Sequence, residues 1–124
     1  MPLLTILVED NATIRENLIP ALSDLAGLQV VAVVDTAASA ISALEAHRDE
    51  WQLAVVDLFL KDGSGLTVVR ACQNRLASQH VLVLTNYATS EIRRRCLDLG
   101  ADGVFDKSTE LESFFARCIS YHDG

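Results

Sequence analysis

Five polar side chains stand at the ends of short apolar runs in this 124-residue chain. Glu9 and Asp10 follow the first run and Asp57 follows the third, while Thr85 and Lys107 come after the last two. Carboxylate oxygens suit a hard cation such as Mg²⁺, which often shares a site with phosphate. A carboxylate can also form an aspartyl-phosphate, and an ammonium or hydroxyl group can stabilise its oxygens. These residue types predict Mg²⁺-dependent phosphoryl chemistry with Asp57 as the nucleophile.

Two alternating periodicities predict the elements that position these side chains. The apolar runs have lengths typical of buried strands and cover residues 3–8, 29–34, 53–56, 80–84 and 103–105. Each run is followed by a stretch whose apolar residues have helical spacing. Continuous apolar strands that alternate with helices predict an α/β fold with a parallel sheet covered on both faces. Right-handed crossovers then give a doubly wound, five-stranded sheet with five helices.

Local signals predict some helix boundaries. Thr13 with Glu16, and Thr109 with Glu112, have the spacing of capping boxes near the starts of the first and last helices. Pro20 lies inside the first helical stretch, where it predicts a bend or a break because proline has no backbone N–H to donate.

The carboxyl ends of the strands are the expected place for a ligand, at the point where the strand order switches. If the first and third strands are neighbours, Glu9, Asp10 and Asp57 converge in one crevice. Like charges at such a distance repel, and each raises the pKa of the others. A bound cation removes the conflict, so the three acids predict a divalent-metal pocket, with Mg²⁺ as the ion.

Composition limits the class of protein. A formal net charge of −7 argues against direct nucleic-acid binding, which needs a basic face. No repeat or linker divides the chain, so we expect one domain over residues 1–124. The N-terminal residues resemble neither a signal peptide nor a membrane span, which predicts a cytoplasmic protein with no membrane partner. Cys72, Cys96 and Cys118 form no CxxC motif and are expected to be small buried hydrophobes.

The order and spacing of the polar residues resemble a known family over the whole chain. The Glu9-Asp10 pair, the lone Asp57 before LFLKDGSG, Thr85 and Lys107 look like the receiver domain of bacterial two-component response regulators. The resemblance implies a flavodoxin-like strand order, 2-1-3-4-5. It also implies a signal-transduction role, in which Asp57 accepts a phosphoryl group from a sensor histidine kinase or a phosphotransfer protein. Such a domain is not an enzyme acting on other substrates, although it catalyses its own phosphorylation and slow dephosphorylation.

The same resemblance assigns roles to individual residues. Asp10 matches the carboxylate that ligates Mg²⁺ directly, and Glu9 would help through a water molecule. The backbone carbonyl of Phe59 matches a further protein ligand of the ion. Thr85 matches the switch hydroxyl that moves toward the phosphoryl group, and Lys107 matches the lysine that pairs with it.

The resemblance also implies how such a domain signals. Phosphorylation would shift an equilibrium between two arrangements and so change the binding of a downstream protein. The expected surface is formed by the fourth helix, the fifth strand and the last helix, and a homodimer is one form that such binding can take. The run of arginines at 93–95 points three ways around the fourth helix, so we expect a solvated face, from which one arginine could still contact a partner.

Four positions depart from the family pattern. Glu9 stands where aspartate is commoner, and Lys61 and Ser108 stand where proline is usual. We expect a trans peptide bond before Ser108, because a cis bond before another residue type is costly, and a differently shaped loop. Val104 replaces the aromatic residue that usually swings inward on activation, so the usual switch is in doubt, and Tyr87 is a candidate for a steric substitute.

Phe59 and Tyr87 each lie two residues after an active-site residue, Asp57 or Thr85. In the family these two positions flank the path of the hydrolytic water. Two aromatic rings there predict a shielded aspartyl-phosphate and slow autodephosphorylation.

Several alternatives remain open. The chain could be the receiver of a longer transcription regulator, or a degenerate receiver that works without phosphate, which Val104 and Ser108 permit. A phosphatase of the haloacid-dehalogenase type needs a second aspartate where this chain has Phe59. A flavin-binding domain of the same topology needs a Ser/Thr/Gly-rich phosphate loop where this chain has EDNAT.

Overall fold

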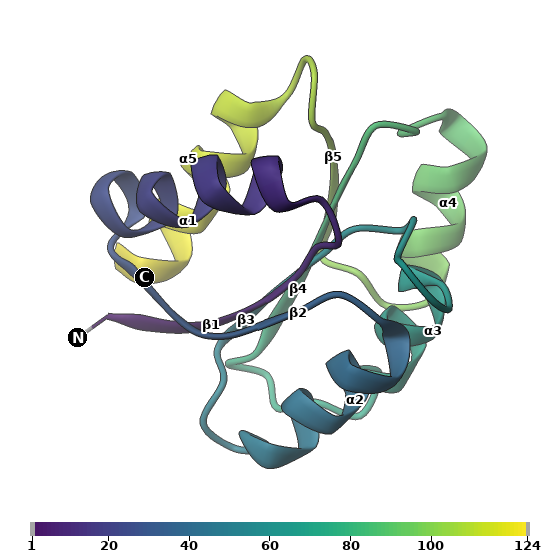
Figure 1. Cartoon of the computed structure of the whole chain (residues 1–124), viewed down its shortest axis with the longest axis horizontal. Coiled ribbons are helices and arrows are strands. Elements are labelled where there is room, and N and C mark those ends of the chain that lie inside the picture. The colour runs from purple at the N-terminus through teal and green to yellow at the C-terminus, as the bar shows by residue number, and fades with distance from the viewer. Residues whose placement is uncertain (1, 124) are drawn as a thin grey trace.

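Five parallel strands alternate with five helices in the computed structural model, which describes residues 2–123 apart from the side chains of residues 25 and 123. The elements are β1 (Leu3–Val8), α1 (Ala12–Ala26), β2 (Leu28–Val34), α2 (Ala37–Ala46), β3 (Leu53–Val56), α3 (Gly65–Ala71), β4 (His80–Thr85), α4 (Ser90–Asp98), β5 (Gly103–Asp106) and α5 (Leu111–Asp123). The strands form one sheet in the order β2-β1-β3-β4-β5 (Figure 1). The predicted fold class and strand order are therefore confirmed.

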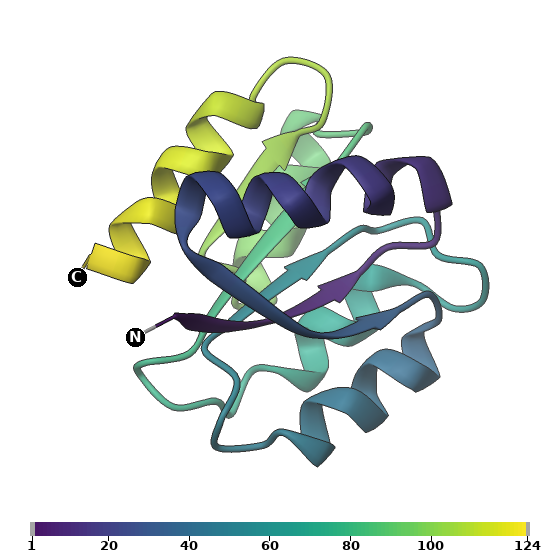
Figure 2. The same ribbon diagram turned by 60° about the vertical axis from the view of Figure 1, so that its left-hand side comes forward.

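The helices form a layer on each side of the sheet, with α1 and α5 on one face and α2, α3 and α4 on the other (Figures 1 and 2). Alternate residues of a strand point to opposite faces. In β4, Val81 and Val83 belong to the core under α2–α4, whereas Leu82 and Leu84 belong to the core under α1 and α5. Burial of each aliphatic side chain contributes roughly 1.5–3 kcal/mol to the free energy of folding. Among the described helices, none has the length and apolar character needed to cross a bilayer.

Helix α1 begins two residues earlier than a capping box at Thr13 would require. Asn11 is the N-cap, and its side-chain oxygen accepts the backbone N–H of Ile14 at 3.0 Å. Thr13 lies inside the helix, so the predicted box with Glu16 is wrong. Asparagine caps as well as threonine does, because its short side chain also reaches the N–H groups of the first turn.

Pro20 lies inside α1 without breaking it, since the helix is continuous from Ala12 to Ala26. The break allowed for in the sequence does not occur. Leu18 and Leu22, on either side of the proline, are buried against the sheet. Their burial on a common face stabilises the helix more than the missing hydrogen bond destabilises it.

The three cysteines are buried, as predicted. Burial raises the pKa of Cys72 to about 11 and that of Cys118 to about 12, because an apolar environment disfavours the thiolate. The pKa of Cys96 is raised for the same reason. These thiols are therefore packing groups of the two cores and not nucleophiles.

The loop between β3 and α3 docks on the start of α2. The N–H of Lys61 donates to the carbonyl of Asp35 at 3.1 Å, and the N–H of Ala37 donates to the carbonyl of Asp62 at 3.0 Å. A proline at position 61 would have no N–H for the first of these bonds. The departure from the family pattern at Lys61 thus supplies a hydrogen bond that fixes the loop.

Gly65 packs directly against the backbone of Asp57. A Cβ atom at this glycine would lie 2.1 Å from the Asp57 carbonyl oxygen and 2.7 Å from Cα of Leu58. Both atoms belong to the backbone, so neither can give way as the end of a side chain could. The residue that begins α3 is therefore restricted to glycine by the chain segment that carries Asp57.

We predict that Gly65→Ala lowers the free energy of unfolding by about 1–3 kcal/mol, because the added methyl group overpacks the junction of β3 and α3. Urea unfolding followed by circular dichroism measures the change. Gly103→Ala is the control, since its Cβ would meet only side-chain atoms, at 3.1–3.3 Å. Equal stability of Gly65→Ala and wild type would contradict the prediction.

Candidate functional site

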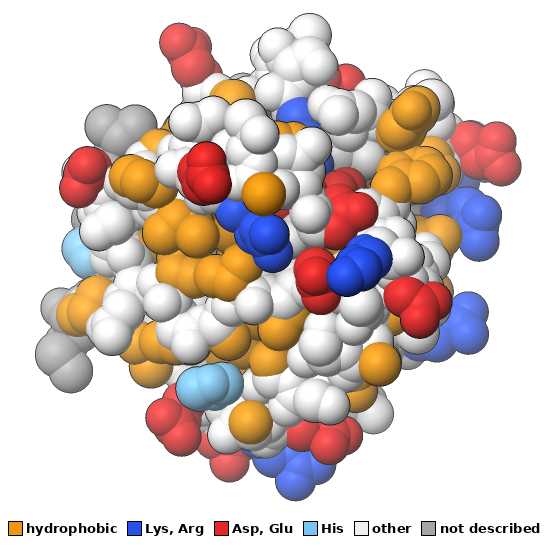
Figure 3. Space-filling model, viewed as in Figure 1, with side chains coloured by type: hydrophobic (Ala, Val, Ile, Leu, Met, Phe, Trp, Pro, Cys, Tyr) orange, Lys and Arg blue, Asp and Glu red, His pale blue; other side chains and the backbone are white. Residues whose placement is uncertain are grey.

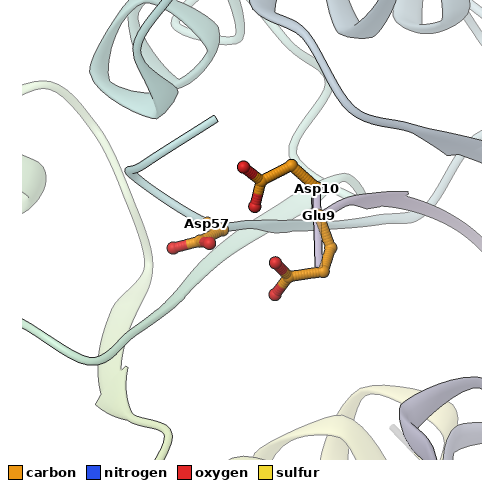
Figure 4. A group of neighbouring side chains, drawn as sticks. All are labelled: Glu9, Asp10 and Asp57. Carbon is orange, nitrogen blue, oxygen red and sulfur yellow. The ribbon is translucent and has the colours of Figure 1, made fainter. Parts of the chain in front are cut away.

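The predicted acids meet at the carboxyl ends of β1 and β3, which are adjacent in the sheet. Each strand continues its hydrogen-bonding pattern by one residue, because Glu9 N–H donates to the Val34 carbonyl and Asp57 N–H donates to the Val8 carbonyl, both at 2.9 Å. One carboxylate oxygen from each of Glu9, Asp10 and Asp57 lies within 4.8 Å of the others. Figure 4 shows the three carboxylates near one another at these two strand ends, with those of Glu9 and Asp10 directed toward the side of Asp57.

Lys107 provides the positive charge in this crevice. Its Nζ lies 2.6 Å from Oε1 of Glu9 and 3.0 Å from Oδ2 of Asp57, and its side chain is only 9 % exposed. Its backbone N–H donates to the Thr85 carbonyl at 2.9 Å, which fixes the loop after β5 beside the end of β4. Among the described residues, this ammonium group is the cation paired with the acids of the crevice, and it contacts two of the three carboxylates. Acidic side chains also gather at the surface near the ends of β1 and β2 (Figure 3, right of centre).

Glu9 is the most buried of the three acids, with 2 % of the residue exposed. Burial raises its pKa, the hydrogen bond from Lys107 lowers it, and the charge of Asp57 raises it, with a net upward shift. Its second oxygen, Oε2, accepts the backbone N–H of Asn11 at 3.2 Å. Glu9 therefore joins the crevice to the cap of α1, a contact that the sequence did not reveal.

The donor set fits a divalent cation. Carboxylate oxygens are the ligands that Mg²⁺ prefers, and the arrangement has more negative than positive charge. The structure places Phe59 in the loop immediately after Asp57, with its N–H 3.5 Å from Oδ1 of Asp57. The ligand role of the Phe59 carbonyl stays a prediction.

Thr85 ends β4, between the strand of Asp57 and the strand of Lys107. It is fully buried, and its hydroxyl oxygen accepts the N–H of Tyr87 at 3.2 Å. The ring of Tyr87 meets that of Phe59 with centroids 4.7 Å apart, and the two residues are 59 % and 55 % exposed. The structure thus brings together the two aromatic residues that the sequence placed beside the site.

The loop after Lys107 is built around Asp106. Oδ1 of Asp106 accepts the N–H of Ser108 at 2.7 Å and that of Thr109 at 3.3 Å, which is an Asx-type turn. A proline in place of Ser108 could not make the first bond. All peptide bonds of the described residues are trans, as expected for this position. The capping box of Thr109 with Glu112 is wrong, because α5 begins only at Leu111.

The surroundings of Val104 and Arg93 became clear only in the structure. Val104 is 8 % exposed and belongs to the core, so it presents no movable ring at the surface. Arg94 and Arg95 are exposed, as expected of a solvated face. Arg93 is an exception, since its half-buried guanidinium donates to the carbonyl of Val104 at 3.0 Å. Helical spacing alone gives no signal for this contact, because its partners lie on other elements.

Comparison with known proteins identifies relatives of the whole chain. The family model of the response regulator receiver domain matches residues 5–118. The virulence transcriptional regulatory protein PhoP of Salmonella typhimurium is 37 % identical over 112 residues, which cover 90 % of this chain and 48 % of that protein. The chain spans about half the length of the curated relatives it matches.

Solved structures share the fold. A CheX–CheY–BeF3–Mg²⁺ complex from Borrelia burgdorferi matches with a TM-score of 0.86 at 15 % identity, over 98 % of this chain and 90 % of that chain. A response regulator protein from Burkholderia pseudomallei, with a phosphorylated aspartic acid, a calcium ion and citrate, matches with a TM-score of 0.76 at 25 % identity. The second match covers 91 % of this chain and 64 % of that chain.

The charge imbalance predicts opposite effects of Asp10→Asn with and without metal. In the presence of a chelator, we expect the variant to be more stable than wild type by about 1 kcal/mol, because one of three facing charges is removed. Excess MgCl₂ should stabilise wild type by mass action and leave the variant nearly unchanged. Urea unfolding under both conditions measures this. Asp24→Asn in α1 is the control, and a variant that gains as much from Mg²⁺ as wild type would contradict the metal pocket.

Proposed function

Because this chain belongs to the response regulator receiver domain family, we propose that it is the phosphoacceptor of a two-component phosphorelay. Receivers of this family interact with histidine kinases and downstream effectors. Here Asp57 takes the phosphoryl group from a phosphohistidine of a sensor kinase or a phosphotransfer protein. The observation that carries the proposal is the crevice itself, in which Asp57 lies 3.0 Å from Lys107 among further carboxylates.

The proposed transfer uses the carboxylate of Asp57 as the nucleophile. One of its oxygens forms a bond to phosphorus as the P–N bond of the phosphohistidine breaks. The ring, protonated on its other nitrogen, keeps the bonding electrons and leaves as neutral imidazole. Asp10 and Asp57, with help from Glu9, would hold a Mg²⁺ ion, which would supply charge neutralisation at the transferred oxygens. Lys107 is already beside Asp57, so its ammonium group needs only a short shift to pair with a phosphoryl oxygen.

The proposed signal begins at Thr85. Its hydroxyl oxygen accepts the N–H of Tyr87, and a hydroxyl that accepts a hydrogen bond can still donate its own proton, here to a phosphoryl oxygen. Movement of Thr85 toward Asp57 shifts the segment between β4 and α4 and so biases the domain toward a second arrangement. A downstream protein, or a second copy of the chain, then binds the face of α4, β5 and α5.

Specific residues argue against a phosphatase and against a phosphate-independent receiver. Phe59 stands where a phosphatase acting through an aspartyl-phosphate needs its acid, so we propose a signalling domain and not an enzyme for other substrates. Glu9, Asp10, Asp57 and Lys107 are all assembled, which favours phosphorylation over a phosphate-independent role. A cytoplasmic location follows from the proposed kinase partner.

A second candidate is the receiver part of a longer transcription regulator. The matched curated relatives are named as transcriptional regulators, and this chain spans about half of their length. In that case the downstream partner would be a DNA-binding region of the same protein. The position of the stop codon in the gene distinguishes the two candidates.

We predict that incubation with acetyl phosphate adds one phosphoryl group to the wild-type chain only when Mg²⁺ is present. Asp57→Asn should gain none, because an amide oxygen is too weak a nucleophile, and Asp24→Asn should behave as wild type. Intact-mass spectrometry measures the gain. A folded wild-type protein that binds Mg²⁺ and gains no mass would favour the phosphate-independent role.

The aromatic pair predicts slow loss of the phosphoryl group. Phe59→Ala with Tyr87→Ala should raise the rate of autodephosphorylation by roughly tenfold, since water then reaches the phosphorus more easily and the barrier falls by about 1.4 kcal/mol. The rate is followed by mass after removal of the donor. Leu76→Ala is the control, because Leu76 is also half-exposed but lies before β4, at the opposite end of the strands from the site. A wild-type half-life as short as that of fast chemotaxis receivers would contradict the shielding.

A further inference from the structure

Arg93, in the first turn of α4, joins three segments of the chain through one guanidinium group. Its Nε donates to the carbonyl of Ala88 at 2.9 Å, Nη1 donates to the carbonyl of Val104 at 3.0 Å, and Nη2 pairs with Oε1 of Glu110. The side chains of Arg93 and Glu110 are only 35 % and 33 % exposed. We call Arg93 and these three acceptors the Arg93 clasp.

Glu110 is held in the clasp from two sides. Its Oε1 also accepts the N–H of Asp106 at 3.0 Å. The hydrogen bond from Arg93, followed by that from the Asp106 backbone, lowers the pKa of Glu110, as expected for a carboxylate stabilised in its charged form. A charge-assisted pair of this kind is stronger and more directional than a neutral hydrogen bond. The clasp therefore ties α4 to the chain segment that leads into α5.

The acceptors of the clasp lie close in the chain to the two switch residues of the site. Ala88 is three residues after Thr85, while the other two acceptors are three residues before and three residues after Lys107. Thr85 and Lys107 are themselves joined, because the Lys107 N–H donates to the Thr85 carbonyl. A displacement of either residue is thus transmitted to the clasp through three peptide units.

The direction of that displacement follows from the order of the strands. β4 lies between β3, which carries Asp57, and β5. If Thr85 moves toward Asp57, the segment that contains Ala88 moves away from β5. Arg93 is also bonded to Val104 on β5 and to Glu110 before α5, so this movement strains the clasp, either at the Ala88 carbonyl or, if α4 moves with Ala88, at the other two acceptors. The clasp is therefore compatible with the resting arrangement and is strained by the activated one.

Val104 occupies the position where the family usually has an aromatic switch residue. Another residue is therefore needed to couple the site to the face of α4, β5 and α5. The side chain of Val104 is buried in the core and has no ring that could swing. Val104 takes part only through its backbone carbonyl, which accepts from Arg93.

We propose that Arg93 is a positioning residue that couples the state of Asp57 to the face of α4, β5 and α5, by stabilising the resting arrangement through the clasp. The inference rests on the proposed phosphoacceptor function. Coupling between two sites is reciprocal, so a contact that favours the resting arrangement must weaken the binding of a phosphoryl mimic at Asp57. Loss of the clasp should therefore strengthen that binding.

The test is calorimetric titration of the folded chain with beryllofluoride in the presence of Mg²⁺. We expect Arg93→Ala to bind at least about fivefold more tightly than wild type. Glu110→Gln and Arg93→Lys should change the affinity in the same direction by less, since each keeps part of the clasp. Arg94→Ala, at an exposed position of the same helix, should bind as wild type does.

The sign of the change separates coupling from a structural role, because a variant that only loosens the fold would bind the mimic equally or more weakly. If wild type binds beryllofluoride and Arg93→Ala binds it equally or more weakly, the proposed coupling through the clasp is overturned. The proposed phosphoacceptor function is not affected by that result. Absence of binding by wild type overturns the proposed function itself. If circular dichroism shows that Arg93→Ala does not fold, Arg93→Lys and Glu110→Gln are titrated in its place. Tighter binding of beryllofluoride by these variants supports the proposal, and unchanged or weaker binding overturns it.

Discussion

Three carboxylates at the ends of two adjacent strands share a single ammonium group, and their mutual repulsion is the constraint on which the site depends. Lys107 contacts Glu9 and Asp57 at the same time, which leaves negative charge uncompensated in a largely buried crevice. Such an arrangement is costly in a protein interior unless a cation or a further donor is supplied. The same imbalance that costs stability gives the crevice a set of carboxylate oxygens that fits a divalent cation.

The rest of the fold holds these charges together. The sheet is packed on both faces, so the ends of β1 and β3 cannot separate without exposing buried aliphatic side chains. Gly65 allows the start of α3 to approach the backbone of Asp57, and the loop after β3 is hydrogen-bonded to the start of α2. A rigid scaffold of this kind keeps like charges close without further ligands.

Two departures from the family pattern have a structural reason in this chain. Lys61 and Ser108 replace prolines, and the N–H group of each is used, one by the Asp35 carbonyl and the other by Asp106. Both loops border the crevice and are fixed by hydrogen bonds where proline would fix them through its ring. The third departure, Val104, lies in the core and places its carbonyl under Arg93. In this receiver domain, backbone hydrogen bonds at these three positions hold the loops around the crevice.

The sequence by itself determined the strands and the place of the polar side chains along them. Because buried strands need continuous apolar residues, the expected strands agree with β1 to β5 to within one residue, and the five polar residues of the site were placed at strand ends. Only the tertiary structure decided which partners these residues have. The contact of Glu9 with Lys107, the packing of Gly65 on Asp57 and the clasp of Arg93 join residues from different elements. The cap at Asn11 and the continuity of α1 through Pro20 also depend on packing against the sheet. Periodicity describes one element at a time, whereas these contacts arise only when the strand order brings distant segments together.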